Sequence, residues 1–210
     1  LGTHVGDDPH SVQQNRALLR AILPAEPAWL TQVHGIHVLN AAHVASAPQA
    51  DASFTDQTNV VCAIMTADCL PVLLADVSGS VVAAAHAGWR GLAAGVLAQT
   101  VQRMRHSGAE TIQAWLGPAI GPKHFEVGED VRQAFMQHDA ALATCFKSIP
   151  DNQEKYLADI YALARSMLKQ EGVTMVTGGE ACTVADAARF YSYRRDGATG
   201  RMAALIWLQS

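Results

Sequence analysis

Apolar positions with a helical period appear first near the N-terminus. Asp8 followed by Pro9 is typical of a helix start, because aspartate accepts hydrogen bonds from the first free amides and proline is tolerated in the first turn. The apolar residues on one face of this predicted helix are Val12, Leu19, Ile22 and Leu23. A similar pattern predicts another helix from Leu92 to near Gly108.

Short apolar runs predict strands through much of the remaining chain. Residues 28–40 predict a half-buried strand interrupted at Gly35, and the small and polar residues to about Asp56 predict a loop. Two further apolar runs are separated by residues 66–69, where Pro71 favours a sharp break because it has no amide hydrogen to donate. The other predicted strands are 81–87, 111–121, 173–178 and 202–208, and the other predicted helices are 128–138 and 155–171.

Strand and helix patterns alternate without an internal repeat or a long linker, which predicts an α+β domain built from layers of helix and sheet. Several predicted strands follow one another closely, so the sheet is predicted to be mixed rather than purely parallel. The chain of 210 residues is half apolar and 16% charged, which favours one compact domain over residues 1–210.

Charge and hydropathy exclude several classes of protein. The net charge is −4 and the basic residues are scattered, which argues against a nucleic-acid partner. The sequence contains no apolar stretch of the ~18 residues that a membrane span needs, and the first ten residues do not resemble a signal peptide. We therefore expect a cytoplasmic protein without a membrane partner. Because the chain opens on Leu1 in a loop-like stretch, we also expect a short N-terminal segment to be missing.

Three residues with metal-binding side chains stand at predicted strand ends or interruptions. His34 precedes Gly35, Cys69 lies at the break between two apolar runs, and His86 ends the next strand. Side chains at such positions can leave the core and point into a shared cavity. One thiolate and two imidazoles are ligands that zinc accepts, and three protein ligands leave a fourth position for water or substrate. These residues therefore predict a catalytic zinc site.

The spacing of these residues alone does not establish the site. Separations of 35 and 17 residues match no short metal motif, and a single histidine is more often a core or surface residue than a ligand. The four cysteines are far apart, which favours reduced thiols over a disulfide framework. The remaining histidines are expected to be solvated: His4, His10, His37, His43, His106, His124 and His138.

Motifs along the whole chain resemble one known family. They are TQVHG, TADCLPVLL, AAHAGWRGLAAGV, LGPAIGP, FEVGEDV, GGEACT and FYSYRRDGATGRMAALIWL. The chain is similar to the laccase-like polyphenol oxidases, a family also named zinc purine nucleoside phosphorylases and peptidoglycan editing factors. The resemblance implies a single three-layer α/β/α domain and a zinc ion held by His34, Cys69 and His86. It also implies purine nucleosides as substrates: adenosine, inosine, guanosine or methylthioadenosine.

Two reactions follow from this resemblance. In phosphorolysis, inorganic phosphate attacks the ribose C1′ as the bond to the purine breaks, and Arg90 beside a predicted helix start is a candidate phosphate clamp. In adenosine deamination, water adds to C6 and ammonia leaves. Gln32 is a candidate for binding a base edge, and Asp68 for orienting a ligand, moving a proton or forming a turn. Tyr193 and Arg194 are candidates for a pocket wall, with structural ion pairing as the alternative.

Other functions stay open at this point. The older family name suggests a copper-dependent polyphenol oxidase, but the sequence contains no His-x-His pair for a trinuclear cluster. A metal-free amide hydrolase would use Cys69 as nucleophile and His86 as base, on peptidoglycan precursors. A binding protein with structural zinc would need a fourth protein ligand, which the sequence does not indicate.

Overall fold

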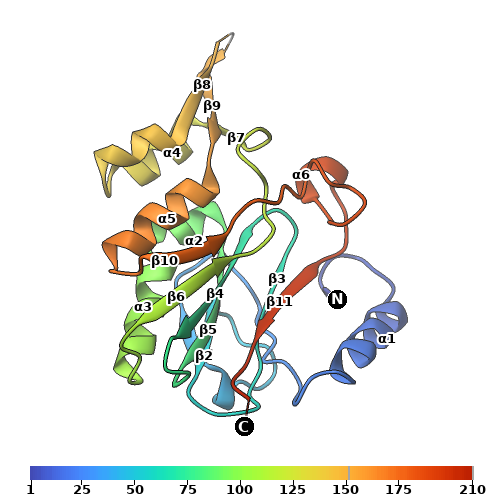
Figure 1. Ribbon diagram of the computed structural model, residues 1–210. Coiled ribbons are helices and arrows are strands. Elements are labelled where there is room, and N and C mark those ends of the chain that lie inside the picture. Colours follow the sequence, from blue (N-terminus) through green and yellow to red (C-terminus); the bar gives the residue numbers. More distant parts are fainter. Residues whose placement is uncertain (151, 210) are drawn as a thin grey trace.

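The structure is a computed structural model that describes residues 1–150 and 152–209. Helices surround a central sheet in Figure 1, and a small hairpin region projects beyond one end. The α-helices are α1 (Pro9–Arg20), α2 (Trp89–Ala94), α3 (Val96–His106), α4 (Glu129–Met136), α5 (Ile160–Gln170) and α6 (Tyr193–Asp196). Two short 3₁₀ helices are η1 (Ala41–His43) and η2 (Ala140–Cys145).

The strands form three sheets. The six-stranded sheet has the order β1-β2-β5-β4-β6-β10, with strands β1 (Val38–Asn40), β2 (Ala52–Thr55), β4 (Leu70–Asp76), β5 (Val82–Ala87), β6 (Ile112–Leu116) and β10 (Met175–Gly178). A two-stranded sheet pairs β3 (Cys62–Thr66) with β11 (Met202–Ile206), and a three-stranded sheet contains β7 (Glu126–Gly128), β9 (Asn152–Ala158) and β8 (Phe146–Ile149).

The large sheet is mixed, as predicted. The two outer pairs, β1–β2 and β6–β10, are parallel, whereas β2–β5, β5–β4 and β4–β6 are antiparallel. Strands β4 and β5 are joined by a tight turn in which the Asp76 carboxylate accepts hydrogen bonds from the hydroxyls of Ser78 and Ser80. Short antiparallel connections of this kind explain why the strands follow one another closely in the sequence.

Alternating side chains on β5 separate two buried clusters. Ala83 and Ala85 join the cluster that contains α3, whereas Ala84 joins the cluster that contains Ile64 of β3. The sheet therefore carries helices α2, α3 and α5 on one face and the β3–β11 pair on the other. Leu19 of α1 packs in a third cluster on the outer side of β3. The predicted α+β class with helical outer layers is confirmed, and two sheets lie between those layers.

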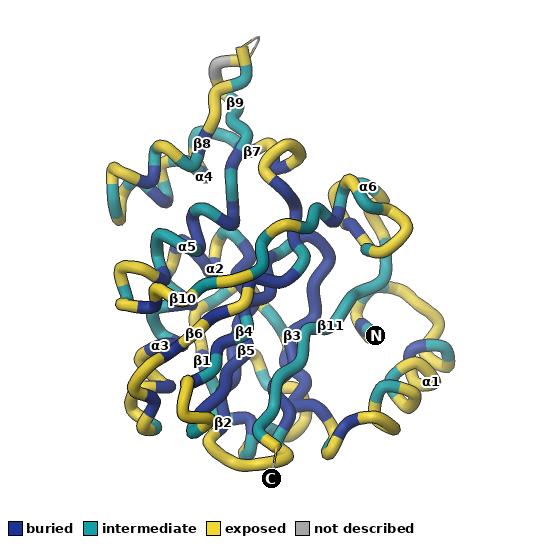
Figure 2. Tube along the Cα trace, viewed as in Figure 1, coloured by how far each residue is buried: buried dark blue, intermediate teal, exposed yellow. Residues whose placement is uncertain are grey.

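Burial is continuous from the large sheet into the small hairpin region. Figure 2 shows buried residues along β3, β4 and β5, and exposed residues on α1 and the outer loops. Phe135 of α4 and Leu142 of η2 belong to the same buried cluster as Leu74 of β4. No described helix has the length and apolar character needed to cross a lipid bilayer.

The predicted first helix is present with the expected cap. Asp8 accepts hydrogen bonds from the amide and hydroxyl of Ser11, and Pro9 is the first helical residue. The helix ends at Arg20, however, so Ile22 lies beyond it and its side chain is 77% exposed. The predicted helix after Leu92 is also divided, because Gly95 has a φ of 99° and separates α2 from α3.

Three segments differ from the sequence prediction. The strand predicted over residues 28–40 is limited to Val38–Asn40, because the amides near His34 bond to a side chain instead of a neighbouring strand. The stretch predicted as a loop to about Asp56 contains β2, which is buried in the centre of the fold. The helix predicted from residue 155 begins at Ile160, and β9 occupies the preceding residues because Asp159 caps the helix.

We predict that Leu74→Ala destabilises the fold by about 2–5 kcal/mol, because it removes a large side chain from the fully buried face of β4. The matched control Leu18→Ala removes a side chain that is 71% exposed on α1, and should change stability by less than about 0.5 kcal/mol. Urea unfolding of both variants tests this. Equal losses would contradict the placement of Leu74 in the core.

Candidate metal centre

His34 lies on a turn that is organised by one carboxylate. The amides of Val33, His34 and Gly35 donate to the Asp51 carboxylate at 3.2, 2.9 and 2.7 Å. His34 has a φ of 60°, in the left-handed region that residues other than glycine rarely adopt. Three converging hydrogen bonds hold this backbone in place, and the exposed imidazole faces a cavity.

His86 is held from the opposite side by the same carboxylate. It lies near the end of β5 on the face shared with Ala84, away from the helices, and is 2% exposed. Its Nδ1 is 2.8 Å from Asp51 Oδ1, and its amide donates to the Asp51 carbonyl at 2.7 Å. Because the carboxylate binds Nδ1, the Nε2 atom is the nitrogen that can bind a ligand.

Cys69 reaches the same place through strand pairing. It lies between β3 and β4, directly before Leu70, which pairs with Ala87 on β5. This register brings the start of β4 beside the end of β5, where His86 is located. Cys69 Sγ is 3.7 Å from His34 Nε2, and the rings of His34 and His86 are 4.8 Å apart between centroids.

The donor atoms of these three residues fit one metal ion. One candidate ligand atom from each of His34, Cys69 and His86 lies within 4.8 Å of the others. Zinc bonds of ordinary length at tetrahedral angles place a sulfur and a nitrogen about 3.6 Å apart, close to the observed 3.7 Å between Cys69 and His34. The three residues selected from the sequence therefore lie together, with a donor set suited to zinc.

Two glycines that follow β5, one at the N-cap of α2 and one inside that helix, make this approach possible. A Cβ atom on Gly88 would lie 2.7 Å from the His34 ring and 3.1 Å from Cys69 Sγ. A Cβ atom on Gly91 would lie 2.8 Å from the Gly35 carbonyl oxygen. Both contacts are closer than side chains tolerate, so these glycines allow α2 to pack against the His34 turn.

Opposing effects set the charge of the cluster. Burial raises the pKa of Cys69, but hydrogen bonds and charge from His34 and His86 outweigh burial and bring that pKa to about 6. Burial lowers the pKa of His86, but hydrogen bonds with Asp51 and Cys69 reverse this and raise that pKa to about 9. Cys69 is therefore a thiolate at neutral pH, which is the form that binds metals.

A cavity of about 440 Å³ opens over the cluster. Its lining includes the three arginines Arg90, Arg194 and Arg201, together with Phe125 and Tyr193. Asp68 is the acidic residue among the described lining residues. The cavity therefore has a cationic wall above the candidate metal ligands.

The predicted substrate-binding residues have different surroundings. Arg90 is exposed and lines the cavity, and its guanidinium lies 4.4 Å from the centre of the Trp89 ring, so its role as a phosphate clamp stays a prediction. Gln32 also lines the cavity, but its amide nitrogen donates to the Met65 carbonyl and its oxygen accepts from the Met65 amide. Gln32 therefore anchors its loop to β3, and recognition of a base edge by Gln32 stays a prediction.

Tertiary structure adds residues that the sequence analysis did not select. Asp51 is 17 and 35 residues away from the histidines it orients, so no local motif marks it. Arg201 lines the cavity and donates to the carbonyls of Thr199 and Gly200. Among the histidines expected to be solvated, His4 lines the cavity and the His124 ring lies 3.4 Å from the Cys182 sulfur.

The fold and the His-Cys-His cluster define an α+β protein with a candidate metal centre. The profile of the family described as Multi-copper polyphenol oxidoreductase laccase matches residues 1–209, and the chain belongs to this family.

Named relatives cover the whole chain. It is 53% identical to the purine nucleoside phosphorylase PA4543 of Pseudomonas aeruginosa, over 100% of this chain and 85% of that protein. It is also 53% identical to the purine nucleoside phosphorylase YfiH of Escherichia coli, over 99% of this chain and 85% of that protein. The crystal structure of Neisseria meningitidis protein NMB0706 matches with a TM-score of 0.93 and 52% identity, covering 100% of this chain and 86% of that one.

We predict that Asp51→Asn lowers zinc affinity by about 10–100-fold, because the amide keeps only one acceptor oxygen, so either the Val33 and Gly35 amides or the His34 amide and the His86 ring lose their acceptor. Competition with a chromogenic chelator measures this affinity. Asp56→Asn, at an exposed loop position, is the matched control and should bind zinc like the unmodified protein. Unchanged affinity in Asp51→Asn would contradict the orienting role.

We predict that the Cys69 thiolate of metal-free protein titrates with a midpoint near pH 6. The absorbance difference at 240 nm between the unmodified protein and Cys69→Ser should fall as the pH decreases through that value, because protonation removes the thiolate band. His34→Ala should move the midpoint upward, because it removes a stabilising hydrogen bond. A midpoint above 8 in the unmodified protein would contradict this electrostatic assignment.

Proposed function

We propose that this chain is a zinc-dependent purine nucleoside phosphorylase. The observation that carries the proposal is the convergence of His34, Cys69 and His86 beneath a cavity with a cationic wall. The names of relatives that are 53% identical over the full chain support the same activity. The proposed substrates are inorganic phosphate and adenosine, inosine, guanosine or methylthioadenosine.

The donor set supports zinc as the metal. A thiolate and two imidazoles suit zinc, and three protein ligands leave a position for a reacting molecule. A zinc ion held by these three residues would supply a Lewis acid able to polarise an oxygen of the substrate. The chain itself contributes the orientation of both imidazoles through Asp51, and it keeps Cys69 deprotonated through contact with His34 and His86.

The cationic wall suits an anionic co-substrate. In phosphorolysis, a phosphate oxygen forms a bond to the ribose C1′ while the glycosidic bond breaks and its electron pair leaves with the purine. Arg90 carries a guanidinium at the cavity and makes no ion pair among the described side chains, so it is available to bind phosphate. The aromatic side chains of Phe125 and Tyr193 supply an apolar wall for a purine ring.

One observation favours a second candidate function. Cys69 is a thiolate at neutral pH and its sulfur lies 3.7 Å from Nε2 of His34, so a metal-free Cys–His amide hydrolase would have His34 as a hydrogen-bonded imidazole beside the predicted base His86. This candidate needs the sulfur to be free for attack, whereas the phosphorylase needs it bound to metal. The two functions therefore predict opposite effects of metal removal.

Elemental analysis and product chromatography distinguish these functions. One equivalent of zinc, and formation of purine and ribose 1-phosphate from adenosine only when phosphate is present, would support the proposal. Inosine and ammonia formed without phosphate would reveal an additional deaminase activity. Amide cleavage by metal-free protein would support the hydrolase instead, and copper with oxidation of a phenol would support the oxidase.

We predict that Arg90→Ala raises the KM for phosphate by about tenfold or more and changes the KM for adenosine by less than about twofold, because a guanidinium–phosphate contact is charge-assisted. Initial rates over a range of each substrate measure this difference. Arg20 is exposed on α1, and Arg20→Ala is the matched control. It should leave the KM for phosphate and the KM for adenosine unchanged. Equal losses for the two substrates would contradict a phosphate-binding role for Arg90.

A further inference from the structure

Asp68 is a buried carboxylate that the proposed mechanism does not use. It is 8% exposed and directly precedes Cys69. Its Oδ1 accepts from the Thr183 hydroxyl at 2.5 Å, and its Oδ2 accepts from the Ser192 hydroxyl at 3.0 Å and the Arg194 amide at 2.6 Å. These partners are more than 110 residues away in the sequence. Asp68 therefore joins the C-terminal segment to the loop that carries a candidate metal ligand.

The hydrogen bonds from Asp68 hold the start of α6. Ser192 is the N-cap of this helix and accepts from the Arg195 amide, while Asp68 binds the Ser192 hydroxyl and the Arg194 amide. The next two residues, Tyr193 and Arg194, line the cavity. The position of this part of the cavity wall thus depends on a carboxylate beside Cys69.

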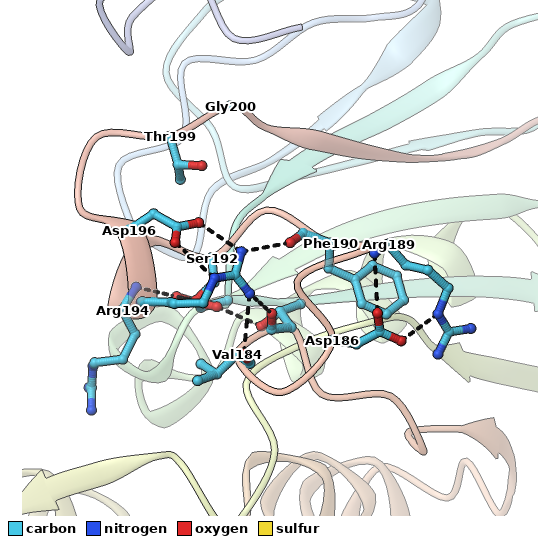
Figure 3. Close-up of polar contacts among 12 residues, drawn as sticks. Val184, Asp186, Arg189, Phe190, Ser192, Arg194, Asp196, Thr199 and Gly200 are labelled. Carbon is cyan, nitrogen blue, oxygen red and sulfur yellow. Dashed lines mark hydrogen bonds and ion pairs between the residues drawn. The ribbon is translucent and has the colours of Figure 1, made fainter.

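Neighbouring arginines on α6 have different roles. The Arg195 guanidinium donates to the carbonyls of Thr183 and Phe190 and pairs with Asp196, which holds the surrounding loop together. Figure 3 shows the Arg194 side chain extending away from these contacts. The Arg194 guanidinium donates to the Glu126 carbonyl at 3.2 and 3.3 Å, and its other N–H groups leave it able to bind an anion in the cavity.

The backbone conformation at Asp68 is unusual and is held in place by the surrounding structure. Its φ of 87° lies in the left-handed region, and its carbonyl accepts from the Ile120 amide at 2.9 Å. Strained backbone of this kind persists only where neighbouring contacts enforce it. The three donors on the carboxylate and the bond to Ile120 supply those contacts.

We infer that Asp68 is a positioning residue: it docks α6 against the Cys69 loop so that Arg194 faces the cavity and binds the phosphate co-substrate. This inference rests on the proposed function for the identity of the anion. The carboxylate binds three protein donors, so its role is to place Arg194 rather than to exchange a proton with substrate.

Asp68→Asn tests this role while keeping a residue that tolerates a positive φ. We predict that this substitution raises the KM and the Kd for phosphate by about tenfold, because the amide group cannot accept from all three donors. The zinc content and the kcat at saturating phosphate should stay within about twofold. Phosphate titrations by calorimetry and initial rates provide these values.

A double-mutant cycle with Arg194→Ala identifies the route of the effect. If Asp68 acts by placing Arg194, Asp68→Asn should weaken phosphate binding little further in the Arg194→Ala background, so the two effects are not additive. Asp186→Asn is the matched control, because Asp186 pairs with Arg189 in the same segment (Figure 3) and neither residue lines the cavity. This control should leave phosphate binding unchanged.

Additive effects in the cycle would overturn the inference, as would a joint loss of zinc and kcat in Asp68→Asn. Asp68→Gly keeps the backbone conformation without the carboxylate, so phosphate binding equal to the unmodified protein would also overturn it. The calorimetric Kd separates this inference from the proposed reaction. Phosphate binding that depends on Arg194 and Asp68 without product formation would support the positioning role and reject the phosphorylase. No phosphate binding by the unmodified protein would overturn the inference itself.

Discussion

The candidate site depends on the Asp51 carboxylate, which joins two segments that are distant in the sequence. It accepts three amides from the His34 turn and contacts the His86 ring, and it is fully buried. A buried carboxylate is costly unless its oxygens are hydrogen-bonded, and four donors satisfy this requirement. The same hydrogen bonds that compensate for burial of the carboxylate also orient the His86 ring and hold the backbone turn that carries His34. The hydrogen bonds that stabilise the buried charge are therefore the same ones that organise the site.

Two left-handed residues frame the cluster and have related causes. His34 and Asp68 both have positive φ angles, and each lies where a carboxylate accepts several hydrogen bonds. At His34 the carboxylate is Asp51, from another segment, and at the second position it is the side chain of Asp68 itself. At His34 hydrogen bonds to a side chain replace bonds to a neighbouring strand, whereas at Asp68 the backbone carbonyl accepts from Ile120 and the side chain binds the C-terminal segment. The chain can thus leave the sheet and expose a candidate ligand or a cavity wall.

Local patterns predicted the parts of the fold whose partners are close in the sequence. Asp8 and Pro9 mark the start of α1, and residues 67–69 separate β3 from β4 as predicted, although Pro71 lies inside β4, where it pairs with His86. Predictions from local patterns were wrong where contacts with distant residues determine the backbone conformation. Ala52–Thr55 is short and follows a stretch of small and polar residues, yet pairing with β1 and β5 makes it an interior strand of the large sheet. The apolar pattern near His34 predicts a strand, but the backbone amides there donate to the Asp51 carboxylate instead of to a neighbouring strand.

The sequence by itself determined the types of the candidate ligands and the positions of Cys69 and His86 at strand ends, because residue chemistry and hydrophobic period are local properties. It also indicated the mixed sheet, because closely spaced strands favour antiparallel pairing. Only the tertiary structure decided that Asp51 orients two imidazoles, that Gln32 binds the backbone of Met65, and that Arg194 and Arg201 share a cavity with Arg90. These relations join residues that are far apart along the chain, and only the packed fold brings such residues within hydrogen-bonding distance or around one cavity.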